Sequence, residues 1–471
     1  MKHLEVSKIG DHRGAPRIWI QGRKASMAGF HPGVKFEALV DKERPLLTLV
    51  PCGNGTRVVS RKRKGDRELP VIDLNSKDLL RVFDGLSSVR VVVSDGKIQI
   101  LPVASEWRAM RRLERIRNRV VSGVPLEVGS TSSGIGVLDL AAHGGFADSG
   151  VETHLAFANE IRDDCMEHAV ERNPAFSRDT ITLTMPMQEL VFDGWAMSQL
   201  PEVDVFLASL PCSGASIAGR TKRRLEHPED HPEVGHLVVS YLAMVARFNP
   251  AITVLENVVP YRSSASMSII RNQLRDLHYD VFELELAAEE WNLLEHRKRL
   301  CMVAVTRGLA FDPSMVRRPA PRVVTFGEIM ESVDPGHGTW GRIDYLWSKL
   351  ERDVAAGKGF SPTVVDAGST RLPTLNKTLH KRQSTGTFIQ HPEDPDKYRI
   401  PTVGEHALAK GIPLDLVEGV TQTFGHEILG QALSLPPFRS VFEAIGRSLK
   451  GFVSRARRQV CFESRVDLIA A

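Results

Sequence analysis

The chain has 471 residues, of which 42% are hydrophobic and 25% are charged, and its formal net charge is +4. These values are ordinary for a soluble globular protein and allow two or three domains, each with its own core. No apolar run approaches the roughly 18 residues of a membrane span, and the first residues lack a signal-peptide core, so we expect a cytoplasmic protein without a membrane partner. The five cysteines form no CxxC pair, so we predict neither a zinc site, nor any other metal site, nor a disulfide framework.

Basic residues gather in four places along the chain, at residues 61–64, 108–119, 220–224 and 455–458. A single cluster of this kind is more often a solvated surface than a binding site. Four clusters in one chain, however, indicate a polyanionic partner.

Residues 1–105 consist of short apolar runs separated by turn residues, a pattern that predicts a small β-rich domain. The runs 89–93 and 98–101 flank Ser94–Lys97, which contains the Asp-Gly signal of a β-hairpin. Over residues 106–121 apolar side chains recur at helical spacing, with arginines on the other face, which predicts an amphipathic helix. A stretch rich in Gly and Ser follows, so residues 106–133 are interpreted as a basic helix and a linker.

From residue 134 to residue 309 apolar strands alternate with helices. The expected strands are 137–140, 155–160, 203–208, 251–255, 279–284 and 300–305, with helices up to residue 172, near 234–248 and near 266–277. Such alternation predicts an α/β fold with a doubly wound parallel sheet, whose ligands bind at the carboxyl ends of the strands. Residues 310–398 are Pro- and Gly-rich and irregular, residues 399–450 include a helix over 438–449, and residues 451–471 form a basic tail.

A cofactor site is indicated where the first two expected strands end. Asp139 ends the first and is followed by Gly144 and Gly145, and Glu160 ends the second. Glycines allow a ligand to approach the backbone, and an acid about 20 residues further on can accept both hydroxyls of a ribose. The phosphate fingerprint G-x-G-x-x-G is absent, which favours S-adenosylmethionine (SAM) over a dinucleotide. The alternative for Glu160 is an acid at a helix N-terminus, favoured by the helix dipole.

Three further signals follow later strands. Pro211 and Cys212 come directly after 203–208, Glu256 comes directly after 251–255, and Arg297 and Arg299 lead into 300–305. Parallel strands would bring the thiol and the carboxylate to one crevice, and the two arginines would point to one face of their strand. Each has a bland alternative: a core cysteine, a helix cap formed with the neighbouring Asn257, and a basic surface turn.

Taken together and in this order, these signals resemble the motifs of the DNA (cytosine-5) methyltransferase family of bacteria and phages. Residues 399–413 look like its ninth motif and residues 430–433 like its tenth, so the resemblance covers roughly 134–450. It implies a class I, Rossmann-like SAM-dependent methyltransferase fold. The sequence departs from the family in a shortened first motif, in Glu295 where the family has Gln, in Gln431 where it has Asn, and in lacking an acid after the third strand.

The resemblance implies a role for each site residue. Cys212 would add to C6 of a flipped-out cytosine, Glu256 would hydrogen-bond the ring, and Arg299, supported by Arg297, would bind the base oxygen or a phosphate. SAM would be bound by Asp139, Gly144, Gly145, Glu160, Pro211 and Gln431. The expected partner is double-stranded DNA, bound by a monomer that a cognate restriction endonuclease accompanies in the cytoplasm.

Contacts to DNA are expected in two segments. The loop 213–232, with Arg220, Lys222, Arg223 and Arg224, would cover the DNA. Residues 310–398 would form the target-recognition domain, in which Lys381 and Arg382 offer cationic side chains to phosphates and bases. About 40 residues of the N-terminal domain are weakly similar to SymE-type domains; otherwise this is an accessory β domain that adds DNA contacts.

Two other functions stay open at this point. The chain could be an RNA (tRNA) cytosine-5 methyltransferase, although the long segment 310–398 favours a substrate whose sequence must be read. It could also be a DNA-binding regulator with a degenerate SAM site, as the altered first motif would allow.

Overall fold

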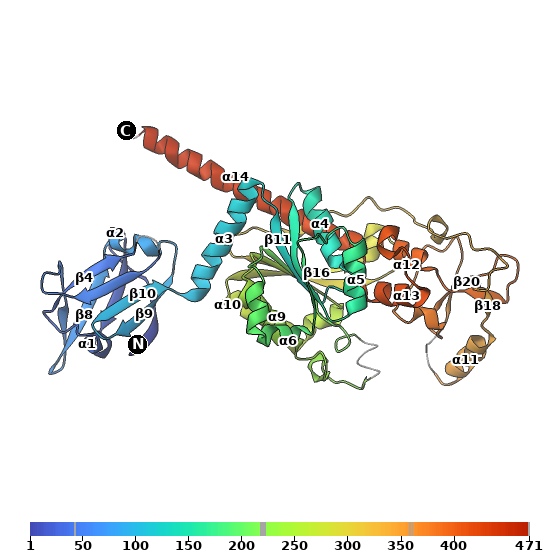
Figure 1. Cartoon of the computed structure of the whole chain (residues 1–471), viewed down its shortest axis with the longest axis horizontal. Coiled ribbons are helices and arrows are strands. Elements are labelled where there is room, and N and C mark those ends of the chain that lie inside the picture. Colours follow the sequence, from blue (N-terminus) through green and yellow to red (C-terminus); the bar gives the residue numbers. More distant parts are fainter. Residues whose placement is uncertain (42–43, 217–222, 358, 360, 470–471) are drawn as a thin grey trace. The chain divides into compact units, whose positions relative to one another are not determined.

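The computed structural model describes residues 1–41, 44–216, 223–357, 359 and 361–469, with side chains as far as Ser454. The chain divides into two compact units, Met1–Arg111 and Arg112–Ala471 (Figure 1). Among the described residues, no helix has both the length and the apolar character needed to cross a bilayer. In the same part of the chain, no three His, Cys, Asp or Glu side chains are grouped as metal ligands.

The first unit contains two antiparallel β-sheets that enclose one core. The larger sheet has the strand order β1-β9-β10-β5-β4-β6, and the smaller has the order β2-β3-β8-β7. The elements are β1 His3–Lys8, β2 Gly10–His12, β3 Ala15–Gln21, α1 Arg23–Met27, β4 Lys35–Val40, β5 Leu47–Pro51, β6 Arg57–Val58, β7 Ser60–Lys64, β8 Arg67–Asn75, α2 Lys77–Leu80, β9 Ser88–Ser94 and β10 Lys97–Pro102.

Alternating burial along the strands builds this core. In β9, Val89, Val91 and Val93 are buried and the residues between them are not. They pack with Ile98 and Ile100 of β10, since strands β9 and β10 form a hairpin with Lys97 opposite Ser94. The predicted hairpin is therefore confirmed.

Helix α3, Ala104–Ser122, confirms the helix expected over 106–121, and three of its arginines form internal contacts. Arg115 Nε and Arg119 Nε lie 2.9 and 3.0 Å from the buried carboxylate of Asp204. Arg112 donates to the carbonyl of Leu277 over 2.7 Å. These three side chains, all of the second unit, hold the C-terminal part of the helix in place, whereas Arg111 and Arg117 of the same cluster are exposed.

The second unit is built on a seven-stranded sheet with the order β13-β12-β11-β14-β15-β17-β16. Its strands are β11 Leu126–Thr131, β12 Thr153–Glu160, β13 Ile181–Thr184, β14 Val205–Ser209, β15 Ile252–Asn257, β16 Tyr279–Ala287 and β17 Lys298–Thr306. Its helices are α4 Val137–Asp148, α5 Asp163–Arg172, α6 Met187–Phe192, α7 Gly194–Gln199, α9 Leu237–Phe248, α10 Ala265–Asp276 and α14 Leu435–Ile469.

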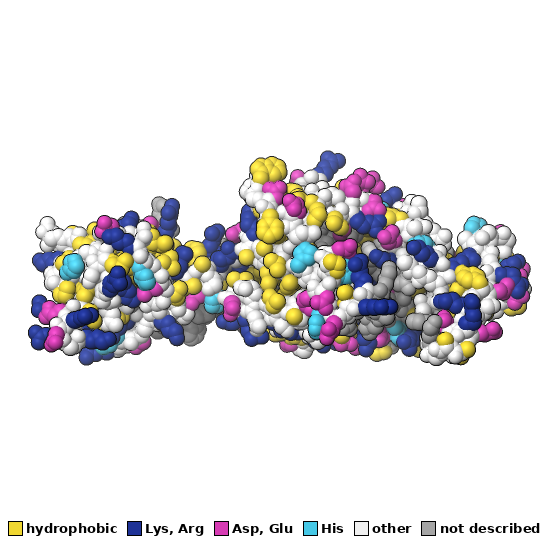
Figure 2. All heavy atoms as spheres, turned by 90° about the horizontal axis from the view of Figure 1, so that it is seen from below, with side chains coloured by type: hydrophobic (Ala, Val, Ile, Leu, Met, Phe, Trp, Pro, Cys, Tyr) yellow, Lys and Arg dark blue, Asp and Glu magenta, His cyan; other side chains and the backbone are white. Residues whose placement is uncertain are grey.

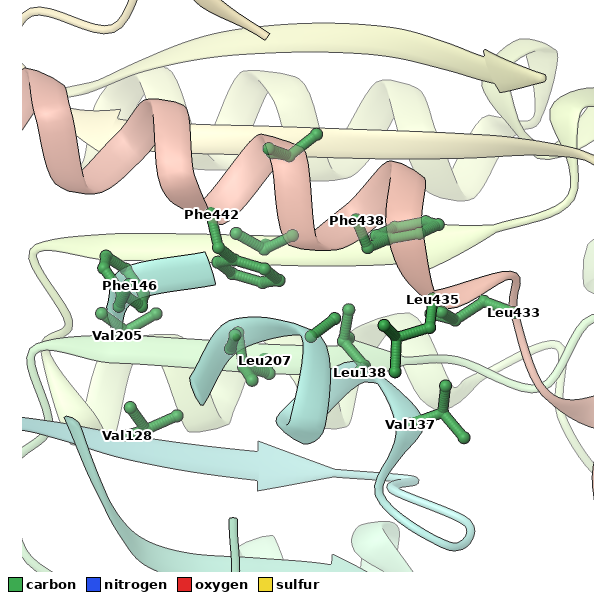
Figure 3. Close-up of a cluster of buried hydrophobic side chains, with 14 of the residues drawn as sticks. Val128, Val137, Leu138, Phe146, Val205, Leu207, Leu433, Leu435, Phe438 and Phe442 are labelled. Atoms are coloured by element: carbon green, nitrogen blue, oxygen red, sulfur yellow. The ribbon is translucent and has the colours of Figure 1, made fainter. Parts of the chain in front are cut away.

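Helices cover both faces of this sheet, as expected of a doubly wound fold. One face packs against α4, α5 and α14, and the other against α6, α7, α9 and α10 (Figure 1). On the first face, Phe146 of α4 and Phe442 of α14 lie over the strands that carry Val128 and Leu207 (Figure 3). The doubly wound α/β architecture is therefore confirmed.

Two expectations about this sheet are wrong. The run Val137–Leu140 is not a strand but the first turn of α4, and the central strand β11 lies in the predicted linker. Gly129 in that strand is needed because a Cβ there would lie 2.3 Å from the ring of Phe157. The sheet is also not wholly parallel: β17 runs antiparallel to both neighbours, since the short connection from β16 cannot make a parallel crossover.

Residues 310–402 contain more regular structure than expected. A small sheet has the order β18-β21-β20-β19. The elements of this region and of the segment after it are β18 Gly341–Arg342, α11 Asp344–Ala355, β19 Thr363–Val365, β20 Thr387–Gln390, β21 Lys397–Arg399, α12 Val403–Ala409 and α13 Gln422–Gln431. Isoleucine, leucine and tryptophan side chains here form two small cores of their own.

Candidate active site

The strands β11, β12, β14 and β15 are parallel, so their carboxyl ends meet at one edge of the sheet. Ser209, the last residue of β14, lies opposite Glu256 of β15. The loops that follow these strands therefore converge, and they contain most of the side chains singled out in the sequence.

The loop after β11 has the geometry of a ligand-binding glycine turn. Gly134 and Gly136 have positive φ angles of 57° and 74°, and a Cβ on Gly134 would meet open space. The backbone N–H of Gly134 donates to Glu160 Oε2 over 2.8 Å, and the N–H of Arg162 donates to Oε1 over 3.1 Å. An open glycine loop, a helix N-terminus directly after it and an acid at the next strand end fit the adenosine and carboxylate groups of SAM.

Gly144 and Gly145 lie further along α4, away from this edge, so their predicted place in a ligand crevice is wrong, whereas Asp139 lies in the first turn of α4, close to the glycine loop and to Ser130 of β11. All three belong to α4, and a Cβ on Gly145 would lie 2.3 Å from the carbonyl oxygen of Arg439 in α14. Asp139 is buried, and that burial raises its pKa to about 6, partly opposed by the Ser130 hydroxyl. The pair Gly134 and Gly136, directly after an extended run, was the signal in the sequence that could have located the cofactor loop.

Cys212 lies in a turn that is held in place from a neighbouring strand. The N–H groups of Ala215 and Ser216 donate to the Cys212 carbonyl over 3.0 and 2.8 Å. Asn257, at the end of β15, donates through Nδ2 to the carbonyl of Leu210 over 3.1 Å. The sequence suggested Asn257 as a possible helix cap; in the structure it connects strand β15, which carries Glu256, to the loop that carries Cys212.

Cys212 differs in exposure from the other described cysteines of the second unit. Its side chain is partly exposed, whereas Cys165 and Cys301 are buried. Burial raises the pKa of the Cys165 thiol to about 12 and also raises that of Cys301. A thiol must be accessible and able to ionise to act as a nucleophile, which among these three favours Cys212.

Glu256 forms an ion pair with Arg299, whose Nε lies 2.8 Å from Oε1, and both side chains are 13% exposed. Burial raises the pKa of Glu256, and the charges of Arg299 and Arg297 oppose the rise only in part. A carboxyl group with a raised pKa can hold a proton and release it as negative charge develops nearby.

Arg297 is 4% exposed and lies close to both reactive groups. Burial lowers its pKa, whereas the charges of Glu295, Glu256 and Cys212 raise it. Its Nη2 donates to the carbonyl of Gly430 over 3.2 Å. The structure thus brings together Cys212, Glu256, Arg297 and Arg299 as the sequence predicted.

A buried ion pair behind Arg297 was not found from the sequence. Lys410, fully buried, lies with Nζ 2.5 Å from Glu295 Oε2. The other oxygen of Glu295 accepts from the N–H of Leu375 over 2.8 Å and lies 3.5 Å from Arg297 Nη1. Burial and the charge of Arg297 together lower the pKa of Lys410 to about 7, although the charge of Glu295 opposes the change. The sequence did contain one signal for this pair: Glu295 stands where the family has Gln, and a buried carboxylate needs a cationic partner.

The remaining predicted residues are placed as follows. Pro211 and Gln431 are exposed, the latter at the end of α13, and Arg224 and Lys381 are exposed as well. Arg223 pairs with Glu233 over 3.4 Å, and Arg382 donates to the carbonyl of Thr339 over 2.5 Å and so connects its own loop to the segment before β18. Arg220, Lys222 and the side chains of residues 455–458 lie outside the described part of the chain.

Comparison with known proteins gives a consistent result. The family model of the C-5 cytosine-specific DNA methylase matches residues 126–447. The type II methyltransferase M.SsoII of Shigella sonnei is 25% identical over 256 residues, which cover 52% of this chain and 64% of that protein. The DNA-cytosine methyltransferase of Escherichia coli K12 is 27% identical over 251 residues, covering 48% and 51%. The chain thus spans less than two-thirds of these relatives.

Among solved structures, the Dnmt2 methyltransferase of S. pombe superimposes with a TM-score of 0.52 at 16% sequence identity. The superposition covers 68% of this chain and 98% of that one. At this identity the likeness supports the fold of the second unit only.

Proposed function

Because this chain belongs to the C-5 cytosine-specific DNA methylase family, we propose that it transfers a methyl group from SAM to C5 of cytosine in duplex DNA. The observation that carries the proposal is the partly exposed thiol of Cys212 in the turn after β14, next to strand β15, which carries Glu256. Two arginines of low exposure complete the group.

The residues divide the chemistry among them. The thiolate of Cys212 attacks C6 of the cytosine, and Glu256 donates a proton to N3 as charge develops on the ring. Arg299 keeps the Glu256 carboxyl in position and offers its remaining N–H groups to the base oxygen. Once C5 carries the methyl group, its proton passes to solvent water and the electron pair re-forms the C5–C6 double bond, so that the bond from Cys212 to C6 breaks and the thiolate is released. The proton on N3 returns to Glu256.

SAM supplies the methyl group when it is bound. We place it at the loop 132–136, with Glu160 accepting hydrogen bonds from the ribose and with Pro211 and Gln431 beside it. The backbone amides at the start of α4 are suited to the carboxylate of the cofactor.

The DNA contacts are proposed on the exposed cations of the second unit. Of the predicted set, Arg224 and Lys381 are the described side chains that are free to reach phosphates. The target base must leave the helical stack, because a thiol cannot reach C6 within a duplex. The target-recognition role of residues 310–398 is part of this proposal. We also propose that the protein acts as a monomer in the cytoplasm. By likeness to type II methyltransferases, we propose that a restriction endonuclease accompanies it.

Methyl transfer can be tested directly. We expect label from methyl-labelled SAM to enter duplex DNA but not tRNA, and bisulfite sequencing of DNA from expressing cells to show 5-methylcytosine within one recurring sequence. Labelling of tRNA alone would instead identify an RNA methyltransferase. Binding of DNA without any methylation would identify a regulator with a degenerate cofactor site.

A further inference from the structure

The charges of this chain are unevenly divided between its two units. Residues 1–111 contain 21 Lys and Arg against 12 Asp and Glu, a net charge of +9. Residues 112–471 contain 40 against 45, a net charge of −5. The excess of positive charge therefore belongs to the unit that lacks the candidate active site, and Lys and Arg side chains are spread over the face of this unit seen in Figure 2. A local excess of this size indicates a polyanionic partner for the first unit.

Much of this charge lies on one β-ribbon, formed by strand β7 and the start of β8. Strand β7 is at the edge of its sheet, and all five of its residues, Ser60–Lys64, are exposed. Lys64 pairs with Arg67 across the turn Gly65–Asp66. The first two residues of β8 are also exposed, so this end of the ribbon extends beyond the core of the unit.

The two faces of the ribbon differ in charge. Because side chains alternate along a strand, Lys62, Lys64 and Arg67 share one face, and Arg61 and Arg63 share the other. The second face also carries Glu68, which lies 3.5 Å from Arg61 and 3.8 Å from Arg63. Where β7 pairs with β8 the first face has no acid; the nearest acids are Asp66 in the turn and Asp73 further along β8, which pairs with Arg17. Lys64 stands directly opposite Arg67, an arrangement that disfavours the hairpin unless negative charge neutralises it.

We propose that the acid-free face of the β7–β8 ribbon, made of Lys62, Lys64 and Arg67, binds the phosphate backbone of duplex DNA. A two-stranded ribbon is narrow enough to enter the major groove, and Lys and Arg bind phosphates through charge-assisted hydrogen bonds. This face has no Asn or Gln with which to read bases, so it binds all sequences alike. The choice of DNA as the ligand rests on the proposed function. The ribbon would be a second DNA-contacting surface, in addition to the one proposed on the second unit.

The test uses the full chain with the substitutions Lys62→Ala, Lys64→Ala and Arg67→Ala. A matched control removes the same charge from exposed positions elsewhere in the unit, as Lys8→Ala, Lys35→Ala and Lys97→Ala. The probe is a duplex of about 30 base pairs built only of A·T pairs, which offers no cytosine to the active site. Affinity is measured against salt concentration, because each lost phosphate contact lowers the slope of log K by about 0.9.

We expect the ribbon variant to lose about three units of salt slope and at least roughly tenfold in affinity near 0.1 M salt, and the control to lose clearly less. The thermal unfolding temperature of the ribbon variant should be no lower than that of the unaltered chain, because the three side chains are exposed and Lys64 and Arg67 repel each other. Equal slopes and affinities for the ribbon and control variants would overturn the proposal. Ribbon-dependent binding of an RNA duplex as tight as that of DNA would overturn the choice of DNA.

Failure of this inference can be told apart from failure of the proposed function. In the ribbon variant, kcat for methyl transfer at saturating DNA should stay unchanged while KM for DNA rises. Cys212→Ser should abolish methyl transfer and leave binding of the A·T duplex and its salt slope intact. If the unaltered chain transfers no methyl group but still binds through the ribbon, only the proposed function fails.

Discussion

Single residues of the site show how buried charges are tolerated. Glu256 is held by Arg299, and Glu295 is held by Lys410 together with the N–H of Leu375. Each carboxylate has lost most of its hydration and has gained a charged partner. Such pairs contribute little net stability, but removal of one partner leaves the other buried and uncompensated.

The Lys410–Glu295 pair leads to a first prediction. Lys410→Met should lower the free energy of unfolding by about 3 kcal/mol, because the buried carboxylate of Glu295 loses its close cation and keeps only Arg297, whose Nη1 is 3.5 Å away. The double variant Glu295→Gln, Lys410→Met should be more stable than Lys410→Met alone. Urea unfolding measures both, and additive losses in the double variant would show that the two side chains are not coupled.

Asp139 leads to a second prediction, on pH. Its pKa is about 6 in the folded chain and close to 3.8 in the unfolded chain, so the folded state holds the proton more tightly. The resulting stabilisation is full below the lower value and is lost as the pH rises through about 6, a change of about 3 kcal/mol. The side chain of Asp139→Asn cannot ionise. The free energy of unfolding of this variant, relative to that of the unaltered chain, should therefore rise between about pH 4 and about pH 7. A constant difference between the two proteins would contradict the assignment.

At the scale of elements, the sequence predicted most strands of the sheet but misplaced the first. A strand such as β14 is recognisable because an apolar run ends at a motif, Pro211–Cys212. The run Val137–Leu140 fits a short strand or a helix equally well, and it was predicted to be a strand because the apolar run is short. Its helical form is stabilised by α14, which comes some 300 residues later in the chain and is not apparent from local pattern.

The contact of α4 with α14 leads to a third prediction. Gly145→Ala should lower stability by about 2–4 kcal/mol, because the new methyl group would lie 2.3 Å from a backbone oxygen of α14 that cannot easily move. Gly194→Ala in α7 is the matched control, since its Cβ would meet nothing within 4 Å. Thermal unfolding compares them, and equal unfolding temperatures would show that close packing at Gly145 is not required.

Glu295 and Lys410 show why part of the site could not be predicted. Cys212, Glu256, Arg297 and Arg299 were found because each stands next to an apolar strand, where periodicity fixes position. Lys410 follows α12, more than a hundred residues after Glu295, and no local pattern connects the two. Contacts between distant segments depend on the packing of the folded chain.

For the whole molecule, the main feature is the division into two units with separate cores. The core that contains Ile98 lies entirely within the first unit, and those that contain Leu207 and Met302 lie within the second. A β-rich unit ending near residue 105 could be predicted from turn spacing. The boundary at Arg111 could not, because it falls inside the continuous helix α3.

Separate cores lead to a fourth prediction. Calorimetry should resolve two unfolding transitions, because the free energy of each core is set by its own contacts. Ile98→Ala should lower only one of them and Leu207→Ala only the other, each by about 2–5 kcal/mol for a fully buried side chain. A single transition lowered by both substitutions would indicate one cooperative molecule.

The fifth prediction concerns the central claim, that Cys212 attacks a cytosine held beside Glu256. Duplex DNA that carries 5-fluorocytosine at the site found by bisulfite sequencing should form a complex with the chain in the presence of SAM, because fluorine blocks the final elimination. This complex should survive denaturation and should disappear in Cys212→Ser. It should persist in the matched control Cys52→Ser, which removes the exposed cysteine of the first unit. A complex that persists in Cys212→Ser, or methylation of ordinary DNA without any trapped complex, would contradict this claim.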